Sequence, residues 1–326
     1  MTPTRLRDLL ETRQVSVYFA AVALAGVLAW RVPATAALTP AIDPLLAFML
    51  FVTFLQVPLT ELRQGVANAR FLGALLAANF VAVPLLVFAL TPWLPADPML
   101  RTGVLLVLLA PCIDYVVTFA HLGRADARSL LAATPVLLAA QMLLLPVFLG
   151  AFLGAFLGDE AAGLVRWGPF LQAFVWLIAV PLALAAVCQA WAARSRPGMR
   201  LARALGLMPV PATAAVLFVV VAAVAPQLGL ALGAVRVVVP VYVAFAVAAP
   251  LLGWAVARAW RLPSGQGRAV AFSSATRNSL VVLPLGLAIP GAVPLVPAVI
   301  VAQTLVELVG ELAYVKLLPR LGPRAE

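Results

Sequence analysis

Long runs of apolar residues, separated by short charged stretches, make up most of this chain. A helix needs about 20 mainly apolar residues to cross the hydrocarbon core of a bilayer, and ten runs come close to or reach that length. Each run predicts one membrane-spanning helix, so that the chain is expected to be an all-α polytopic membrane protein. The ten predicted spans cover residues 15–32, 42–60, 71–93, 102–121, 128–152, 169–193, 208–230, 235–259, 269–289 and 293–317.

The basic residues between the spans predict the orientation of the chain. With a cytoplasmic N-terminus, 17 of the 22 basic residues fall on the cytoplasmic side and four fall outside, while Arg277 remains within a span. Cytoplasmic loops of membrane proteins carry an excess of Lys and Arg. We therefore expect a multi-pass protein of the plasma membrane with both termini in the cytoplasm.

Composition argues against several other classes of protein. The 326 residues are 64% hydrophobic and 10% charged, whereas soluble domains are about half apolar and about a quarter charged. The net charge of +10 does not point to nucleic acid here, because the basic residues lie between spans and the lipid bilayer is the expected partner. Two cysteines and one histidine are too few for a disulfide framework or a zinc site. We expect no cofactor, no metal and no enzymatic activity.

The two halves of the chain resemble each other. Residues 79–88 pair with 245–254, and residues 135–143 pair with 297–305, at offsets of 166 and 162 residues. Each half holds five spans, and this odd number places the second half in the opposite orientation. Inverted repeats are typical of secondary transporters, in which the solute lies near mid-membrane at interrupted helices. The expected parts are a cytoplasmic N-terminus at 1–14, a first five-helix repeat at 15–152, an external connector at 153–168, a second inverted repeat at 169–318 and a cytoplasmic C-terminus at 319–326.

Two polar stretches interrupt predicted spans and occupy matching places in the two halves. One contains Pro111, Cys112 and Asp114, and the other runs from 273 to 279 and contains Arg277. A charge at this depth costs at least a few kcal/mol and usually faces a partner, a cavity or a transported solute. We expect Asp114 and Arg277 to meet where two broken helices cross. Either the pair takes part in substrate or proton coupling, with the planar guanidinium bridging Asp114 and an oxyanion, or it is a permanent structural ion pair.

The first of these stretches resembles a known family. Ala-Pro-Cys-Ile-Asp-Tyr and the residues that follow as far as Asp126 resemble the fourth span of arsenite-efflux permeases, in which a Pro-Cys pair precedes the helix break. Over essentially all ten spans the chain is similar to the bile acid:sodium symporter superfamily, to which those permeases belong. Pro84 and the Arg-Asn-Ser run at 277–279 also fit. The resemblance implies a panel domain of spans 1, 2, 6 and 7, and a core domain of spans 3–5 and 8–10 in which unwound spans 4 and 9 cross.

Several residues depart from the family pattern. The resemblance implies that sodium-coupled members place a glutamate and a glutamine where this chain has Ser273 and Arg277, and a glutamine where it has Asn79. The permeases carry a glutamate at the position of Leu280. The sodium site that the family implies thus lacks a carboxylate and has gained a cation, which counts against ordinary sodium coupling. We hypothesise that the Arg277 guanidinium occupies the place of the sodium ion.

Further polar residues near the interruptions complete the candidate site. A cysteine thiolate is a good ligand for trivalent arsenic, which makes Cys112 a candidate ligand, although free cysteine is equally typical of small buried apolar positions. Unwound helices also expose carbonyl oxygens and N–H groups to solutes. The candidate binding residues are Asn79, Cys112, Asp114, Tyr115, Thr118, Ser273, Thr276, Arg277, Asn278, Ser279 and Glu307.

The tenth predicted span carries two carboxylates. Glu307 and Glu311 are four residues apart and therefore share a helix face. Glu307 lies near mid-depth and is either a proton carrier or a hydrogen-bonding residue of the bundle. Glu311 is expected nearer the cytoplasm, paired with Lys316 or water. Gln141 and Gln303, which the repeat relates, are expected to join helices and not to bind ligand.

These patterns favour a secondary active transporter. The resemblance implies an arsenite or related oxyanion exporter driven by the proton motive force, with H⁺ favoured over Na⁺ as coupling ion. The alternative within the same fold is a sodium- or proton-coupled symporter of an organic anion such as a bile-acid-like solute. A channel and an intramembrane enzyme are the other classes considered, but an HExxH motif is absent and one histidine does not make a His-based metal site.

Overall fold

The computed structural model describes residues 3–56, 68–113, 115–158, 168, 171–172, 175–228, 231–287, 289 and 291–322. Over these residues the regular elements are all helices, as expected from the apolar runs. Asp114, one member of the expected ion pair, lies outside the described residues.

Helix packing divides the chain into two compact units, each built from two separate stretches. Unit 1 comprises Met1–Leu59 and Leu171–Gly229, and unit 2 comprises Thr60–Phe170 and Leu230–Glu326. Unit 1 therefore holds predicted spans 1, 2, 6 and 7, and unit 2 holds spans 3–5 and 8–10. This is the grouping that the family resemblance implies for the panel and the core.

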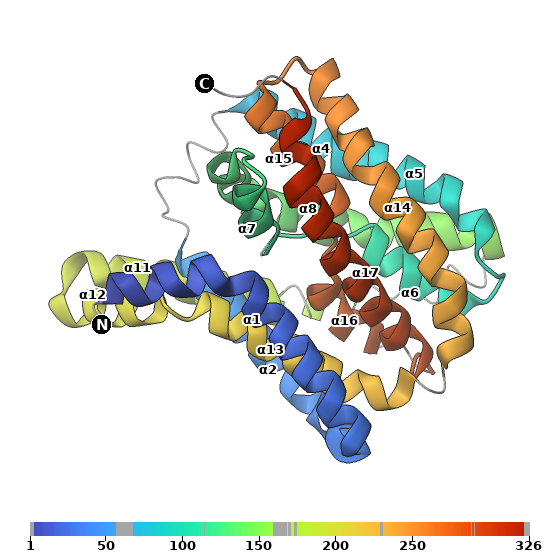
Figure 1. Cartoon of the computed structure of the whole chain (residues 1–326), viewed down its shortest axis with the longest axis horizontal. Helices are drawn as coiled ribbons and strands as arrows, with labels where there is room; N and C mark the ends of the chain where they lie inside the picture. The colour runs from blue at the N-terminus through green and yellow to red at the C-terminus, as the bar shows by residue number, and fades with distance from the viewer. Residues whose placement is uncertain are drawn as a thin grey trace. The chain divides into compact units, whose positions relative to one another are not determined.

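Unit 1 is a bundle of apolar helices. Its elements are α1 (Pro3–Arg31), η1 (Pro33–Ala41), α2 (Ile42–Leu55), η4 (Val175–Ala179), α11 (Val180–Arg194), α12 (Arg196–Leu205) and α13 (Pro209–Leu228). The long helices α1 and α13 pack along each other, and α2 packs against both α11 and α13 (Figure 1). Buried aliphatic side chains of α2, such as Leu46 and Leu50, form part of the core of this unit.

Unit 2 contains both polar stretches. Its elements are α4 (Ala69–Ala77), η2 (Ala78–Ala82), α5 (Val83–Leu90), η3 (Thr91–Trp93), α6 (Pro98–Leu108), α7 (Tyr115–Leu122), α8 (Ala127–Leu157), α14 (Leu232–Ala259), α15 (Ser264–Ala275), α16 (Ser279–Leu287), α17 (Leu295–Leu317) and η6 (Leu318–Arg320). Helix α17 packs against α6, α7, α14 and α16, and α14 packs along α15 (Figure 1). The fourth and ninth predicted spans are thus each two short helices with an irregular segment between them.

Small residues allow the close helix contacts that hold these short helices. A side chain at Gly253 of α14 would collide with Ser274 of α15, and one at Gly103 of α6 would collide with Val299 of α17. In membrane proteins, small residues at helix interfaces let the backbones approach closely. The two glycines therefore let α14 and α17 pack tightly against the interrupted spans.

A π-helical turn precedes a proline in each unit. In unit 2, η2 ends at Ala82 and Pro84 follows in α5; in unit 1, η4 precedes Pro181 in the same way. Proline lacks an N–H and its ring clashes with the preceding turn, and π turns are known sites at which a helix accommodates such a break. Asn79 lies within η2 and is fully buried.

Seven helices among the described residues are long and apolar enough to cross a membrane. They are Arg13–Arg31, Ala34–Leu55, Ala69–Trp93, Ala127–Leu157, Pro209–Pro226, Leu232–Ala259 and Leu295–Arg320. These correspond to predicted spans 1, 2, 3, 5, 7, 8 and 10. The prediction of a polytopic all-helical membrane protein is confirmed, while the count of ten spans stays a prediction.

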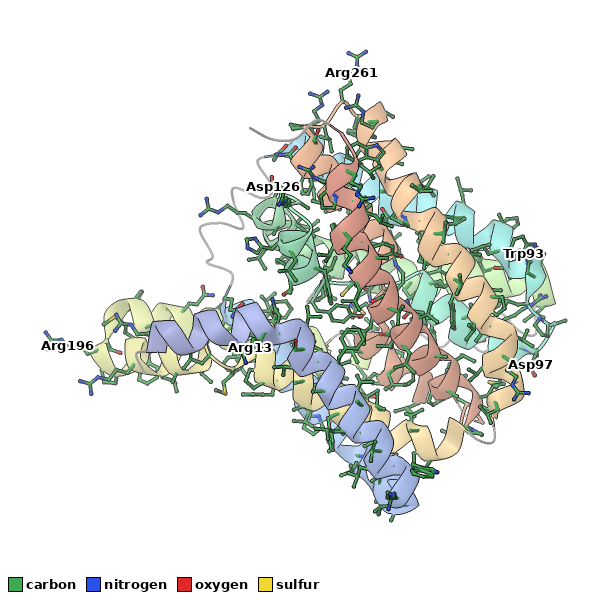
Figure 2. The ribbon with its side chains drawn as sticks, viewed as in Figure 1. Arg13, Trp93, Asp97, Asp126, Arg196 and Arg261 are labelled. Atoms are coloured by element: carbon green, nitrogen blue, oxygen red, sulfur yellow. The ribbon has the colours of Figure 1, made fainter. Side chains whose placement is uncertain are left out.

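Polar residues start several helices of unit 2. Asp97 accepts a hydrogen bond from the N–H of Leu100 and begins α6, and Asp126 accepts one from the N–H of Ser129 and begins α8; carboxylates at this position satisfy free N–H groups of the first turn. Figure 2 shows Trp93 and Asp97 at one end of this unit, and Asp126 and Arg261 at the other. The charged turns therefore lie at opposite ends of the helices, as spans that cross a bilayer require.

Candidate functional site

The two helix interruptions of unit 2 hydrogen-bond to each other through their backbones. The N–H of Cys112 donates to the carbonyl of Thr276 over 3.0 Å, and the N–H of Asn278 donates to the carbonyl of Ala110 over 2.8 Å. These two bonds make Pro111 and Arg277 an antiparallel bridge. Buried backbone groups must find partners, so the two segments can both be unwound in the interior because each satisfies the other.

The register of this bridge explains the residues that occupy its centre. The bonds come from the residues that flank Pro111 and Arg277, which form a pair that exchanges no hydrogen bond of its own. Proline lacks an N–H, and because the bridge needs no donor at this position, no hydrogen bond is lost. On the opposite segment, the N–H of Arg277 is left free to bond elsewhere, and it donates to Oε2 of Glu307 over 2.6 Å.

The guanidinium of Arg277 is fully buried and bound by neutral oxygens. Its Nη2 donates to Oδ1 of Asn79 over 2.9 Å and to the carbonyl of Ser273 over 2.5 Å, and Nη1 lies 3.4 Å from the carbonyl of Leu108. The guanidinium carbon is 5.5 Å from the ring centre of Phe245, within the range of a cation–π contact. Arg277 itself has 0% exposure.

Two helix C-termini meet at this guanidinium. Leu108 is the last residue of α6 and Ser273 lies in the last turn of α15. The last carbonyls of a helix lack partners within it, and they carry the negative end of the helix dipole. The broken helices thus provide the partial negative charge that stabilises a buried cation at their crossing.

Asn79 connects this cation site to the third predicted span. Its Nδ2 donates to the carbonyl of Leu75 over 3.1 Å and to Oγ of Ser273 over 3.0 Å, while its Oδ1 accepts from Arg277. All of its polar atoms are therefore satisfied in the interior. The structure brings Asn79, Ser273 and Arg277 together, three residues that the sequence placed in the candidate site.

Glu307 of α17 accepts hydrogen bonds from three donors. Its Oε1 accepts from the hydroxyl of Tyr115 over 2.5 Å, and its Oε2 accepts from Nε2 of Gln303 over 2.7 Å as well as from the N–H of Arg277. The side chain is buried, with 2% exposure. Glu307 therefore ties α17 to the start of α7 and to the α15–α16 interruption, which fits its expected hydrogen-bonding role.

The expected pairing of Glu311 with Lys316 or water is wrong. It has 0% exposure, and its Oε1 lies 2.5 Å from Oγ1 of Thr276, whereas Lys316 is exposed. Residues four apart share a helix face, and each further residue turns by about 100°. Glu311 therefore points with Glu307 at the α15–α16 interruption, and Lys316, five residues on, points elsewhere.

Of the remaining candidates, Asn278 and Ser279 lie at the α15–α16 interruption, Cys112 lies at the α6–α7 interruption, and Thr118 lies on α7. Nδ2 of Asn278 lies 3.3 Å from Oε1 of Gln141, and Oγ of Ser279 accepts from the hydroxyl of Thr304 over 2.8 Å. Cys112 is fully buried next to the bridge. Thr118 is half-buried on α7. The contact expected between Asp114 and Arg277 stays a prediction, since Asp114 is outside the described residues.

Sequence reasoning missed three parts of the site. The carbonyls of Leu108 and Ser273 bind the guanidinium, and such backbone ligands leave no signal in a sequence. Phe245 lies next to the guanidinium, although its place in an apolar span marked it only as core. Gln303 was expected to join helices, but its amide donates to Glu307 of the same helix, α17.

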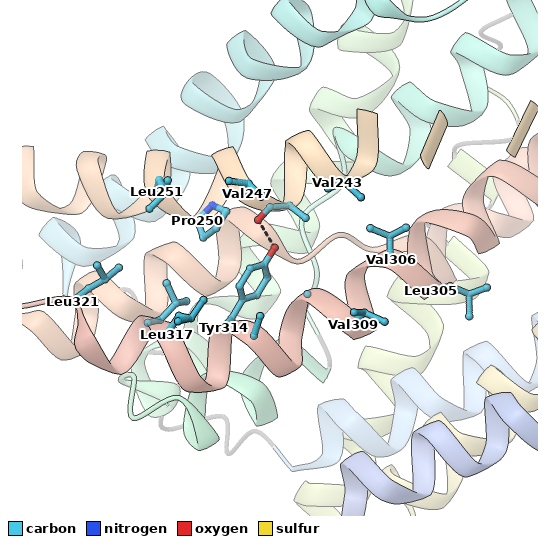
Figure 3. Close-up of a pocket in the computed structure, with 14 residues that line it drawn as sticks. Val243, Val247, Pro250, Leu251, Leu305, Val306, Val309, Tyr314, Leu317 and Leu321 are labelled. Atoms are coloured by element: carbon cyan, nitrogen blue, oxygen red, sulfur yellow. Dashed lines mark hydrogen bonds between the residues drawn. The ribbon is translucent and has the colours of Figure 1, made fainter. Parts of the chain in front are cut away.

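An apolar groove of about 690 Å³ runs between α14 and α17. Figure 3 shows its walls, which are aliphatic apart from Tyr314, whose hydroxyl donates to the carbonyl of Ala246. Its lining on α17 includes Leu305 and Val309, which lie about half a turn from Glu307. The groove contains none of the candidate site residues.

Comparison with known proteins identifies one matching family model and no matching curated protein. The model of the Sodium Bile acid symporter family matches residues 43–232, which is more than half of the 326 residues. Members of this family are membrane transporters of small organic solutes with ion coupling, and the seven apolar helices accord with an integral membrane protein. The matched range includes the α6–α7 interruption and ends before the α15–α16 interruption. The chain belongs to the Sodium Bile acid symporter family.

Proposed function

We propose that this protein is a secondary active transporter that exports arsenite or a related oxyanion and draws on the proton motive force. The observation that carries this proposal is the buried Arg277 guanidinium at the crossing of two unwound segments. A permanent cation there favours a negatively charged or strongly hydrogen-bonding solute, and it leaves no need for a bound metal cation at the same place.

The guanidinium retains donors for such a solute. Its Nε is buried and has no hydrogen-bond partner among the described residues, and Nη1 has only the long contact to Leu108. Arginine binds oxyanions through two parallel N–H donors on one edge. The edge of Arg277 that carries Nε is shared with Nη2, whose bonds go to Asn79 and Ser273. We therefore propose that the Nε–H alone binds either the solute or Asp114, the residue expected to be its counter-ion.

Cys112 supplies the second part of the proposal. It follows the proline of the bridge, and its N–H bonds to Thr276, so its backbone is fixed at the crossing. A single thiolate can bind trivalent arsenic reversibly, which an exporter requires. The family position of this Pro-Cys pair and its place next to Arg277 in the bridge together support arsenite over other solutes.

The remaining parts of the proposal concern the architecture of the transporter. We propose that the chain has ten spans in two inverted five-helix repeats, that both termini are cytoplasmic, and that unit 2 acts as the core and unit 1 as the panel of an alternating-access transporter. The division into two units with this membership supports that arrangement.

A second function is favoured by the family match. Because the family is that of sodium bile acid symporters, an organic anion carried with sodium or protons is the alternative solute. The Arg277 guanidinium also suits a carboxylate or sulfonate. The two functions therefore differ in the solute and in the coupling ion.

Flux measurements in everted membrane vesicles separate the two functions. Arsenite, antimonite and taurocholate are supplied in turn, under an imposed proton gradient or an imposed sodium gradient. The expected result is arsenite accumulation driven by the proton gradient and unaffected by sodium. Sodium-driven taurocholate flux without arsenite flux would reject the exporter and establish the organic anion symporter.

A further inference from the structure

Glu311 is a buried carboxyl group with an unusual hydrogen-bond environment. Its Oε1 contacts Oγ1 of Thr276 over 2.5 Å, and its Oε2 is buried with no hydrogen-bond partner among the described residues. A buried carboxylate normally accepts bonds at both oxygens, since an unpaired charge in the interior is costly. A neutral carboxylic acid carries no charge, so leaving one of its oxygens without a hydrogen bond costs less free energy.

The hydroxyl of Thr276 indicates where the proton lies. Its Oγ1 is 2.5 Å from Glu311 Oε1 and 2.7 Å from the carbonyl oxygen of Phe272. A threonine hydroxyl has one hydrogen to donate and two lone pairs to accept with. It cannot donate to both oxygens. Both contacts become hydrogen bonds only when Thr276 donates to Phe272 and Glu311, carrying a proton on Oε1, donates to Thr276.

Glu307 provides the contrast within the same helix. Each of its three contacts is a true donor, namely the hydroxyl of Tyr115, the amide of Gln303 and the N–H of Arg277. An ionised carboxylate is an acceptor only, so this environment suits a charged Glu307, which balances the charge of Arg277. A second negative charge at Glu311, four residues away on the same face, would be repelled by Glu307.

We propose that Glu311 is a protonated carboxylic acid in this conformation and is the exchangeable proton site of the transport cycle. This inference rests on the proton coupling in the proposed function. Because Glu311 has 0% exposure, its proton exchanges with water only in another conformation. When the proton leaves, Thr276 must turn its hydroxyl from Phe272 to Glu311.

Thr276 links this proton to the crossing of the broken helices. It ends α15, and its carbonyl accepts from the N–H of Cys112 in the other interruption. Loss of the proton therefore changes the hydrogen bonding of the residue that connects the two unwound segments. Protonation at Glu311 is in this way coupled to the segment that holds Arg277.

Other ionisable groups lie on and around α17. Glu307, Tyr314 and Lys316 lie on α17 itself; Tyr314 donates to Ala246, and Lys316 is exposed. Helix α16 contains no ionisable residue. The groups on the other elements packed against α17, or on the segments next to them, are Arg101 of α6, Cys112 before α7, Tyr115 and His121 of α7, Arg236, Tyr242 and Arg258 of α14, Arg268 of α15, Arg277 between α15 and α16, and Arg320 of η6. Asp114 is outside the described residues.

Infrared spectroscopy of the purified, lipid-reconstituted protein tests the proton site without any solute. A protonated carboxylic acid gives a carbonyl band that shifts in D₂O, and we expect this band in the wild type and its loss in Glu311→Gln. Glu307→Gln is the matched control, one turn away on the same helix, and should keep the band. A band that persists in Glu311→Gln, or one that vanishes in Glu307→Gln, overturns the proposal.

A second variant keeps the test valid if Glu311→Gln does not fold. Thr276→Val removes the hydroxyl that accepts the Glu311 proton, so the carboxylic acid band should move to higher frequency. An unchanged band frequency contradicts the proposal.

Transport assays give an independent readout. Glu311→Gln should retain arsenite exchange down its gradient and lose accumulation driven by a pH gradient, because the amide imitates the protonated acid permanently. Proton-driven accumulation by this variant would reject the coupling role. Absence of arsenite flux in the wild type would reject the proposed solute alone, because the infrared result does not depend on it.

Discussion

At the scale of single residues, Arg277 is bound in a way that a sequence only partly reveals. Its position in an apolar span marked it as important, and its contact residues Asn79 and Ser273 were among the candidates. The carbonyls of Leu108 and Ser273 could not be foreseen, because backbone ligands depend on where a helix ends. The partner of Glu311 was not foreseen, because Thr276 lies far from it in sequence, at the α15–α16 interruption.

Removal of the Arg277 side chain should both destabilise the protein and abolish transport. Arg277→Ala leaves Asn79 Oδ1 and two carbonyls without their donor, at about 1–3 kcal/mol for each buried group. Arg277→Lys restores a cation but not the planar pair of donors, so it should recover most of the stability and little of the flux. Thermal unfolding and vesicle flux measure the two effects, and full oxyanion transport by Arg277→Lys would contradict the role given to the guanidinium.

Cys112 offers a test of the solute that uses the second cysteine as control. Cys112→Ser keeps the backbone bond to Thr276 but removes the thiolate, and we expect arsenite transport to fall at least about tenfold, equal to about 1.4 kcal/mol. Cys188 is also buried but lies in unit 1, and Cys188→Ser should leave the flux unchanged. Equal arsenite flux in the two variants would assign Cys112 to packing alone.

At the scale of elements, proline and polar residues predicted the interruptions well. Pro111 and the 273–279 stretch marked the fourth and ninth spans, and the structure breaks both helices there. The pairing of the two segments through backbone bonds was not predictable, because it depends on a register between residues far apart in sequence. The π turn that carries Asn79 was likewise unforeseen.

The position of Pro111 in the bridge predicts what its replacement does to helix α6 and to transport. Pro111→Ala adds an N–H and removes the ring that opposes helical continuation, so α6 should extend towards Cys112 and the crossing should be lost together with transport. Pro146 lies inside the continuous helix α8, and Pro146→Ala is the matched control that should transport normally. Amide hydrogen exchange over 109–113 should slow in Pro111→Ala, and unchanged exchange there would contradict this account.

At the scale of the whole molecule, the division into two units follows from chain topology. Each unit collects two stretches that are distant in sequence, which apolar patterning alone does not predict, since apolarity marks a span but not its neighbours. The grouping came from the family resemblance. Within the sixth predicted span, residues 169–193, the described elements are η4 and α11.

Cysteine labelling tests the predicted orientation. Ala96, His121 and Ala259 are exposed in turns or at helix ends, and the two native cysteines are buried and should react slowly. An impermeant thiol reagent applied to intact cells should label Ala96→Cys, and it should label His121→Cys and Ala259→Cys only after the cells are opened. The reverse pattern would invert the topology, and labelling of all three from one side would reject the spans between them.

The carbonyl oxygens at the ends of α6 and α15 surround a positive charge that is part of the polypeptide. An ion held only by such oxygens would be lost by dilution and would have to be recaptured in each turnover. A tethered guanidinium is always present, so this position is neutralised at any external salt concentration. The carbonyl dipoles are therefore balanced by the chain itself, whatever the ionic composition on either side of the membrane.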